Sequence, residues 1–356
     1  MNRVLLVGFV AVGAAVAAGC PSAVDPGDPT PSAVEPPAEC AALWDDASVQ
    51  DRWSSLASLT DPVWAGWAPV DATIVWAEEV DAGWCHALWS GGDVAGYALL
   101  ADGPTYGFGA YGYLMPWSNG GFLDDLVVQP PSVTDWLTGE GVESAVLLPR
   151  QSSFDALVQV QLPIHEAFHV TVQGPSWFGE LADDWPAWMR LDLPRAELEA
   201  CYQAGDFGAE HGALVEAVEA ALGGDDVCSA AQGFIAARAA RHAAADAAGL
   251  TIGSTDPLGC ADAEAVYEGL EGIADAVSWG PLVDAGIASD AEWLSRLGAT
   301  SASADPFYQL GSGQLFVLDR TGADATAFVS AFIAGTGPDA GVHALFVAEI
   351  DALCSR

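Results

Sequence analysis

The chain has 356 residues, 49 of them acidic and only ten basic, which gives a formal net charge of −39 at pH 7. Such a charge repels nucleic acids and anionic membrane surfaces, so it excludes both as binding partners. Apolar residues make up 51% of the chain, yet beyond the N-terminus no apolar run reaches the length of a membrane span. The body of about 315 residues is long enough for one large or two medium domains.

The N-terminus predicts a signal peptide over residues 1–19. One positive charge, on Arg3, precedes about fifteen apolar or small residues, a run too short for a stable membrane span. Residues 16–20 read Val-Ala-Ala-Gly-Cys and resemble the bacterial lipobox, in which the chain is cut before a diacylated cysteine. We expect a lipid on Cys20; an ordinary signal peptide with a nearby cysteine is the alternative. Pro21 favours the outer membrane or cell surface of a bacterium.

Residues 20–40 comprise Cys20 and a proline-rich tether. Six prolines and no aromatic residue occur between positions 21 and 39. A segment of this composition cannot bury enough apolar surface to offset the entropy of ordering it, so we expect an extended, disordered linker. The protein is then expected to contact a membrane only through its lipid.

Residues 41–150 are rich in Trp and Gly, and short apolar runs alternate there with Gly-rich turns. This texture is typical of a sheet with few helices. The predicted strands lie at residues 72–76, 85–89, 97–100 and 144–148. With the helix that follows, this part is predicted to form a sheet-bearing lobe over residues 41–175.

A possible metal-binding helix ends this lobe. Residues 156–162 alternate like a strand, but Ser153 can equally cap a helix through them, and either way His165-Glu166-Ala167-Phe168-His169 falls on a helix. There His165 and His169 project from one face and can share a metal ion. Glu166 is turned about 100° away, where it reaches a metal-bound water without binding the metal. A helix with two incidental histidines is the alternative.

Residues 176–356 predict a mainly helical lobe. The first expected helix starts near Pro194, the second spans 210–222, and the third follows Ser229 and ends before Gly249. Further helices are expected at 261–277, after a capping box at 289–292, and near 325–334 and 342–353. The predicted fold class is α+β, with a zinc site in the cleft between the two lobes.

Six cysteines remain after Cys20: Cys40, Cys85, Cys201, Cys228, Cys260 and Cys354. An even number in an exported protein indicates three disulfides, and the lack of a CxxC pair argues against a cysteine zinc site. Of the fifteen possible connectivities, we favour those with a bridge between Cys201 and Cys228, because both flank the helix at residues 210–222.

Residues 162–173 resemble the active-site helix of the gluzincins, the thermolysin-like zinc peptidases, and more narrowly bacterial relatives in which a Gln follows the motif. The resemblance implies a zinc ion held by His165, His169 and a glutamate on a separate downstream helix. Residues 271–275, Glu-Gly-Ile-Ala-Asp, are similar to that glutamate helix and make Glu271 the implied third ligand. Two stretches also resemble a later block of these relatives, at residues 307–311 and 318–320.

The predicted helix at 261–277 offers three candidate ligands, Glu264, Glu268 and Glu271, spaced along one stripe. Burying three carboxylates side by side is costly, so one is expected on zinc and the others in solvent or at hydrogen-bond partners. We favour Glu271, because Gly272 lets another backbone or substrate come close and Asp275 is placed to accept a hydrogen bond from a ligand histidine. Glu268 and Glu264 remain alternatives.

Outside these motifs, Tyr308 is a candidate hydrogen-bond donor to a tetrahedral intermediate, with a core tyrosine as the alternative. Arg238 and Arg241 lie one turn apart and either pair with neighbouring carboxylates or bind a substrate carboxylate. The other histidines lie outside any ligand spacing and are interpreted as structural: His86, His211, His242 and His343.

The sequence therefore predicts a zinc-dependent peptidase at the cell surface that acts on a peptide or protein. Zinc is expected to polarise the scissile carbonyl and acidify a water, with Glu166 as general base and then as proton donor to the leaving amine. The rival hypothesis is a surface lipoprotein that keeps this fold and binds or scaffolds without turnover.

Overall fold

The computed structural model describes residues 35–61, 67–101, 105–106, 112–114, 127–128, 131–142, 145–149, 156–173, 195–224, 226–253, 257–302, 306–323 and 341–355. The predicted signal peptide, the lipidated Cys20 and the helix expected near residues 325–334 lie outside the described residues. No helix among the described residues combines the length and apolar character needed to cross a bilayer. Val34–Arg356 forms one compact unit, and the division into two lobes at residue 175 stays a prediction.

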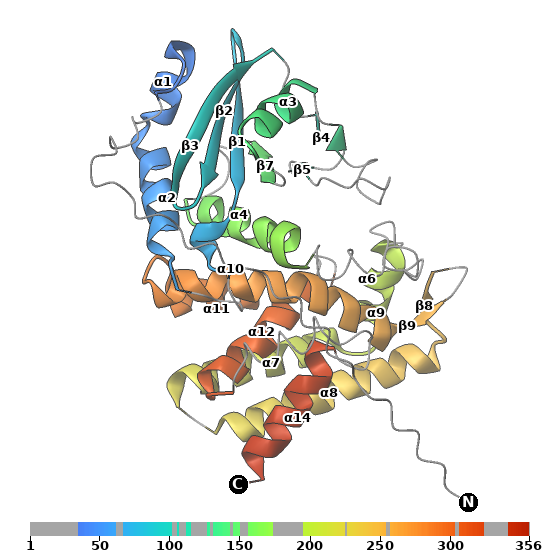
Figure 1. Ribbon diagram of the computed structural model, residues 1–356. Helices are drawn as coiled ribbons and strands as arrows, with labels where there is room; N and C mark the ends of the chain where they lie inside the picture. The colour runs from blue at the N-terminus through green and yellow to red at the C-terminus, as the bar shows by residue number, and fades with distance from the viewer. Residues whose placement is uncertain are drawn as a thin grey trace, which may run out of the picture. The chain divides into compact units, whose positions relative to one another are not determined.

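A five-stranded mixed sheet forms the β part of the molecule (Figure 1). Its order is β3-β2-β1-β7-β5, with bounds β1 (Ile74–Val80), β2 (Gly83–Ser90), β3 (Asp93–Leu100), β5 (Gly112–Leu114) and β7 (Ala145–Pro149). The first three strands form an antiparallel meander, β7 pairs in parallel with β1, and β5 is antiparallel to β7. Two-residue strands form the pairs β4 (Thr105–Tyr106) with β6 (Val127–Val128) and β8 (Thr251–Ile252) with β9 (Leu258–Gly259). The four predicted strands are confirmed as β1, β2, β3 and β7.

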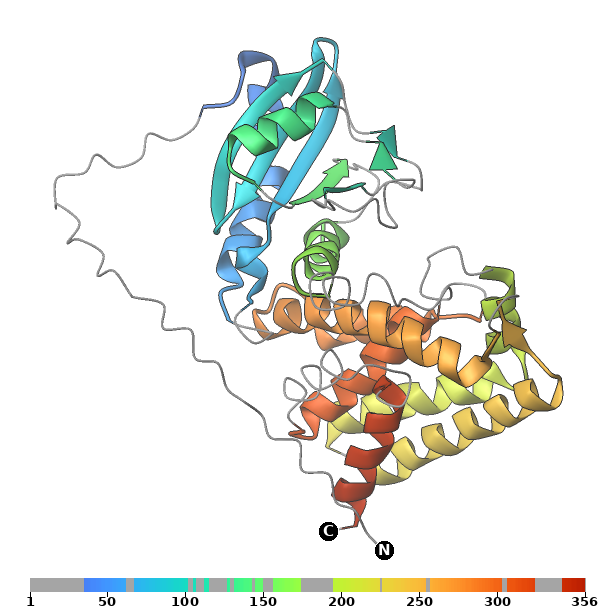
Figure 2. The same ribbon diagram turned by 45° about the vertical axis from the view of Figure 1, so that its right-hand side comes forward.

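Helices cover both faces of this sheet, as Figure 2 shows. They are α1 (Ala38–Trp44), α2 (Ala47–Ser58) and α3 (Pro131–Gly139). Successive side chains of a strand point to opposite faces. Trp76 of β1 therefore lies in the main core, its ring 6.1 Å from that of Trp53 in α2. Val75, its neighbour, packs in a second cluster with Val133 of α3, so β1 is buried on both sides.

The N-terminal helices correct two expectations. Few helices were expected before residue 150, yet the buried Val49, Trp53 and Leu56 of α2 follow the helical period. The predicted tether over 20–40 also runs too far, because α1 begins at Ala38. Cys40, its last predicted residue, is buried and bonded to Cys85.

The histidine motif lies on α4 (Val158–Phe168), which continues as a π-helical turn, η2 (His169–Gln173). Of the two interpretations of residues 156–162, the helical one is therefore correct. The helix α4 contacts β7 of the sheet and also α10 (Ile273–Asp284), so it joins the sheet to the helical part.

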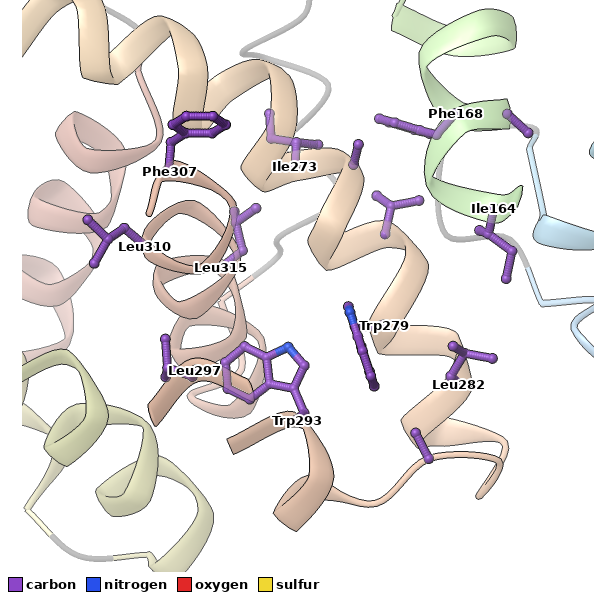
Figure 3. Close-up of a cluster of buried hydrophobic side chains, with 14 of the residues drawn as sticks. Ile164, Phe168, Ile273, Trp279, Leu282, Trp293, Leu297, Phe307, Leu310 and Leu315 are labelled. Carbon is purple, nitrogen blue, oxygen red and sulfur yellow. The ribbon is translucent and has the colours of Figure 1, made fainter. Parts of the chain in front are cut away.

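The rest of the described chain is mainly helical, which together with the sheet confirms the α+β class. It contains η1 (Pro69–Asp71), α6 (Arg195–Gln203), α7 (Phe207–Gly223), α8 (Val227–Ala247), α9 (Cys260–Tyr267), η4 (Glu268–Gly272), α10, α11 (Asp290–Gly298), α12 (Phe307–Arg320) and α14 (Val342–Cys354). The predicted capping box of Ser289 and Glu292 opens α11. Figure 3 shows α10 between α4 and α12, with apolar side chains from all three helices in the core.

Two glycines allow α12 to cross the turn that precedes α10. A Cβ atom on Gly272 would lie 2.6 Å from the Cα atom of Gly311, and one on Gly311 would lie 2.7 Å from that of Gly272. Neither distance is tolerable, so glycine is required at both positions. The close approach expected at Gly272 is confirmed, and the backbone that approaches is that of α12.

The six cysteines of the body form three disulfides, Cys40–Cys85, Cys201–Cys260 and Cys228–Cys354. The expected number is confirmed, but the bridge between Cys201 and Cys228 is wrong. These residues flank α7, whose 17 residues extend about 25 Å, whereas bonded cysteines need Cα atoms within about 7 Å. A rigid helix between two cysteines keeps them apart.

Two buried arginines of α8 organise the helical part. Arg238 Nη2 lies 2.6 Å from Glu268 Oε1, and Arg241 Nη1 donates to Glu264 Oε1 at 2.7 Å. Arg241 also pairs with Glu210 of α7, and all five side chains are shielded from solvent. Burial raises the pKa of Glu264, but the hydrogen bonds and charges of its partners outweigh it and lower the pKa to about 2. Of the two interpretations of these arginines, pairing with neighbouring carboxylates is confirmed.

This charge network extends to the C-terminal helices. Gln314 of α12 donates from Nε2 to Glu268 Oε2 at 3.0 Å, and its Oε1 lies 2.8 Å from Nδ1 of His343 in α14. Burial, with further lowering by nearby positive charge, brings the pKa of His343 to about 2, so this histidine is neutral and donates from Nδ1. Glu268 is thus bound from α8 and from α12.

Removing both cysteines of the long bridge should destabilise the protein more than removing a shorter one. The Cys228–Cys354 bridge spans 126 residues and the Cys40–Cys85 bridge 45, which in the chain-entropy model correspond to about 5 and about 4 kcal/mol. Denaturant unfolding of the two double-serine variants measures the difference. Peptide mapping without reduction checks the connectivity, and a Cys201–Cys228 peptide would contradict it.

Replacing Arg241 with Met should lower the free energy of unfolding by about 3–5 kcal/mol, because Glu210 and Glu264 stay buried but lose the guanidinium group that hydrogen-bonds both of them. Arg320 is the matched control, since it is 31% exposed and pairs with Asp290 at 3.3 Å on the surface. Arg320→Met should cost less than about 1 kcal/mol. Similar losses for the two variants in urea titrations would show that the buried network is not a main source of stability.

Candidate metal centre

Two helical segments distant in sequence bring three metal-binding side chains together. His165 lies on α4, His169 opens the π turn η2, and Glu271 lies in the π turn η4. The turn η4 leads into α10, and α10 packs against α4, so residues 102 apart in the chain become neighbours. Single π turns within helices are frequent at functional sites.

The three potential ligand atoms form a nearly equilateral triangle. Nε2 of His165 lies 3.1 Å from Nε2 of His169, and each nitrogen lies 3.2 Å from Oε2 of Glu271. A tetrahedral zinc ion bound at about 2.0–2.1 Å holds its ligand atoms about 3.3–3.4 Å apart. The triangle therefore matches three corners of the tetrahedron that a zinc ion would require.

The charges in this triad favour a cation. Burial lowers the pKa of His169, but the charge and hydrogen bond of Glu271, with smaller effects from nearby groups, raise it to about 9. Burial raises the pKa of Glu271, yet its two histidine partners outweigh burial and hold it well below the ordinary value. Glu271 is therefore ionised, and the point between the three side chains attracts positive charge, either a proton or a metal ion.

The other two candidate glutamates contact different partners. Glu264 and Glu268 are fully buried in the charge network described above, where guanidinium groups compensate their charge. Of the three alternatives for the third ligand, Glu271 is the one that contacts both histidines.

Gln173, the last residue of η2, contacts both segments of the site. Its Oε1 atom lies 2.5 Å from Nδ1 of His169, and its Nε2 atom donates to the carbonyl oxygens of Gly269 at 3.3 Å and Leu270 at 3.0 Å. The sequence assigned Gln173 no role of its own. The available signal was its spacing, because a residue four positions after His169 lies on the same helical face.

Asp275 was predicted to accept a hydrogen bond from a ligand histidine, and this prediction is wrong. Its Oδ1 accepts from Nη2 of Arg296 at 2.9 Å, and within the described part of the chain its buried Oδ2 has no hydrogen-bond partner. The π turn around Glu271 changes the rotation per residue, so regular i, i+4 spacing does not carry Asp275 to the histidines. Gln173 makes the contact with His169 instead.

Both predicted catalytic residues lie beside the triad. Glu166 is only 7% exposed, and its negative charge contributes to the raised pKa of His169. Tyr308 of α12 packs its ring 5.7 Å from that of His165 and 4.8 Å from that of Phe307. Their positions agree with the expected roles, which stay predictions.

The remaining histidines contact groups away from the triad. His86 contacts the Trp84 carbonyl and His211 the Leu297 carbonyl, while His242 contacts Glu264 and His343 contacts Gln314. Burial lowers the pKa of His86 to about 4, more than the Trp84 carbonyl raises it, so this histidine is neutral. Each contact agrees with the structural role expected from the sequence.

Comparison with known proteins assigns no family to this site. No protein-family model matches the chain, and no curated protein or solved structure matches it significantly. The candidate metal centre is therefore characterised by its own residues and geometry.

Proposed function

We propose that the protein is a zinc metallopeptidase of the gluzincin kind. The convergence of His165, His169 and Glu271 at distances suited to one tetrahedral ion is the observation that carries the proposal. Two histidines and one glutamate, with a fourth position open, are the donor set of catalytic zinc in thermolysin-like enzymes. The spacing of the motif and the position of Glu271 add to this support.

The chain's own residues divide the chemistry among them. Bound zinc supplies a Lewis acid and lowers the pKa of water. Glu166, beside the ligands, takes the proton of the attacking water and passes it to the leaving amine. Tyr308, next to the ring of His165, donates a hydrogen bond to the oxygen that becomes negatively charged.

The peptide or protein substrate binds, in this proposal, in a cleft between the sheet-bearing lobe and the helical lobe. The helix α4 supports this placement, because it contacts β7 of the sheet and α10 of the helical part. A substrate next to the motif helix would thus meet elements of both parts.

The proposal includes export and anchoring through Cys20 at the outer membrane or cell surface. Three disulfides within the body suit an oxidising compartment outside the cytoplasm. The lipid is then the membrane contact, and the charge of −39 disfavours nucleic acid as a partner.

The second candidate is a surface lipoprotein that binds or scaffolds without turnover. It accounts equally well for the fold, the disulfides and a bound metal. The buried Glu166 favours the enzyme, because a site that only binds zinc does not require a carboxylate in that position.

Glu271→Gln should abolish stoichiometric zinc binding, because it removes the one anionic ligand. Glu268→Gln is the matched control: it changes the same π turn in the same way, but its side chain contacts Arg238 and not the histidines. Metal analysis of the purified mature proteins, with circular dichroism to verify folding, decides between them. Full zinc occupancy in Glu271→Gln would reject the site, and zinc loss in folded Glu268→Gln would move the ligand there.

Glu166→Gln should keep zinc but lower the rate of peptide cleavage about 10²–10⁴-fold, the usual contribution of a general base. A peptide library digested by the zinc-loaded wild-type protein and by the variant, followed by mass spectrometry, measures this. Bound zinc with no cleavage that depends on Glu166 would favour the non-catalytic lipoprotein.

A further inference from the structure

We infer that Gln173 is a positioning residue of the metal centre: its amide keeps a proton on Nδ1 of His169 and so presents Nε2 to the metal. The inference rests on the proposed zinc site and adds to it a residue that is not a ligand. Gln173 is fully buried and contacts one ligand directly and the backbone beside another.

The neighbours of Gln173 fix the orientation of its amide. Carbonyl oxygens of Gly269 and Leu270 lie 3.3 and 3.0 Å from one end of the amide, and a carbonyl oxygen can only accept a hydrogen bond. That end must be the NH2 group. Oε1 therefore faces His169, 2.5 Å from Nδ1.

This orientation selects one tautomer of His169. An amide oxygen accepts but cannot donate, so the hydrogen bond requires the proton on Nδ1. A metal ion would replace the proton on Nε2, and the proton held on Nδ1 leaves the Nε2 lone pair as the one that can bind it. Nε2 is the atom that lies in the triangle with His165 and Glu271, and the selected tautomer is therefore the one that binds a metal.

The NH2 group of Gln173 also sets the distance between the two segments. Gly269 and Leu270 lie in η4, immediately before Glu271. A π turn shifts the backbone hydrogen-bond pattern by one residue, which leaves carbonyl oxygens able to accept from a side chain. One amide thus orients His169 and holds the backbone of Glu271 next to it.

Gln161 offers a matched control. It is a second buried glutamine of the motif helix, and its Nε2 donates to Oγ of Ser278 in α10 at 2.7 Å. Both glutamines tie this helix to the segment of Glu271, but the Gln161 side chain hydrogen-bonds Ser278 and not His165, His169 or Glu271. Replacing either glutamine removes a buried hydrogen bond. Only the replacement of Gln173 also removes the acceptor for Nδ1 of His169.

The test measures zinc affinity of the purified mature protein by competition with a chromophoric chelator. Gln173→Met, which has a similar length and no acceptor comparable to an amide oxygen, should bind zinc about 10–100-fold more weakly than wild type. Gln161→Met should stay within about threefold of wild type, because the hydrogen bond that it loses goes to Ser278 and not to a ligand.

A second measurement follows the proton itself. In the zinc-loaded wild type, the Nδ1 proton of His169 should give a slowly exchanging NMR signal, which should be absent from Gln173→Met. Equal zinc affinities of Gln173→Met and Gln161→Met would overturn the inference. If wild type and Gln161→Met bind no zinc, the proposed function itself fails. If both bind zinc and Gln173→Met binds it equally well, only the role of Gln173 fails.

Discussion

The burial of Arg238 and Arg241 is the constraint on which the helical part depends. A guanidinium group is stable away from water only where carboxylates surround it, and here Glu210, Glu264 and Glu268 come from three different elements. None of these charges is compensated until the elements meet, so the helices must assemble as a set. Because Glu268 lies in the same turn as Glu271, the network also fixes the backbone of the proposed third ligand.

The π turn η4 lets two glutamates of one short segment contact partners on different sides. In a regular α-helix, residues three apart lie along one stripe, and Glu268 and Glu271 would face the same way. A π turn has more residues per turn and rotates them apart, so Glu268 contacts Arg238 while Glu271 contacts the histidines. Of the helices in the long separation between the two motifs, α7 supplies Glu210, α8 supplies both arginines and α9 supplies Glu264.

Local pattern predicted what local geometry determines: the strands, the capping box and the pairing of His165 with His169. It failed where contacts between elements distant in sequence determine the structure. Helix α12 was not predicted, because Gly311 and Gly313 weaken helix propensity. The backbone of Gly272 leaves no room for a side chain at Gly311, and at Gly313 a side chain would displace Leu214. The role of Asp275, the cysteine pairing and the contacts of Gln173 depend on π turns and on packing, which residue spacing alone does not reveal.

The bridge between Cys228 and Cys354 closes a covalent ring that contains α12 and the turn carrying Glu271. In the proposed setting, outside the cytoplasm, the protein would meet proteases and, as a peptidase, other copies of itself. One cut in an exposed loop of this ring leaves both new ends attached to the same molecule, while buried ion pairs keep the pieces in register. The proposed metal centre can thus outlast nicking that would divide an open chain, because separating the two pieces covalently requires cleavage and reduction together.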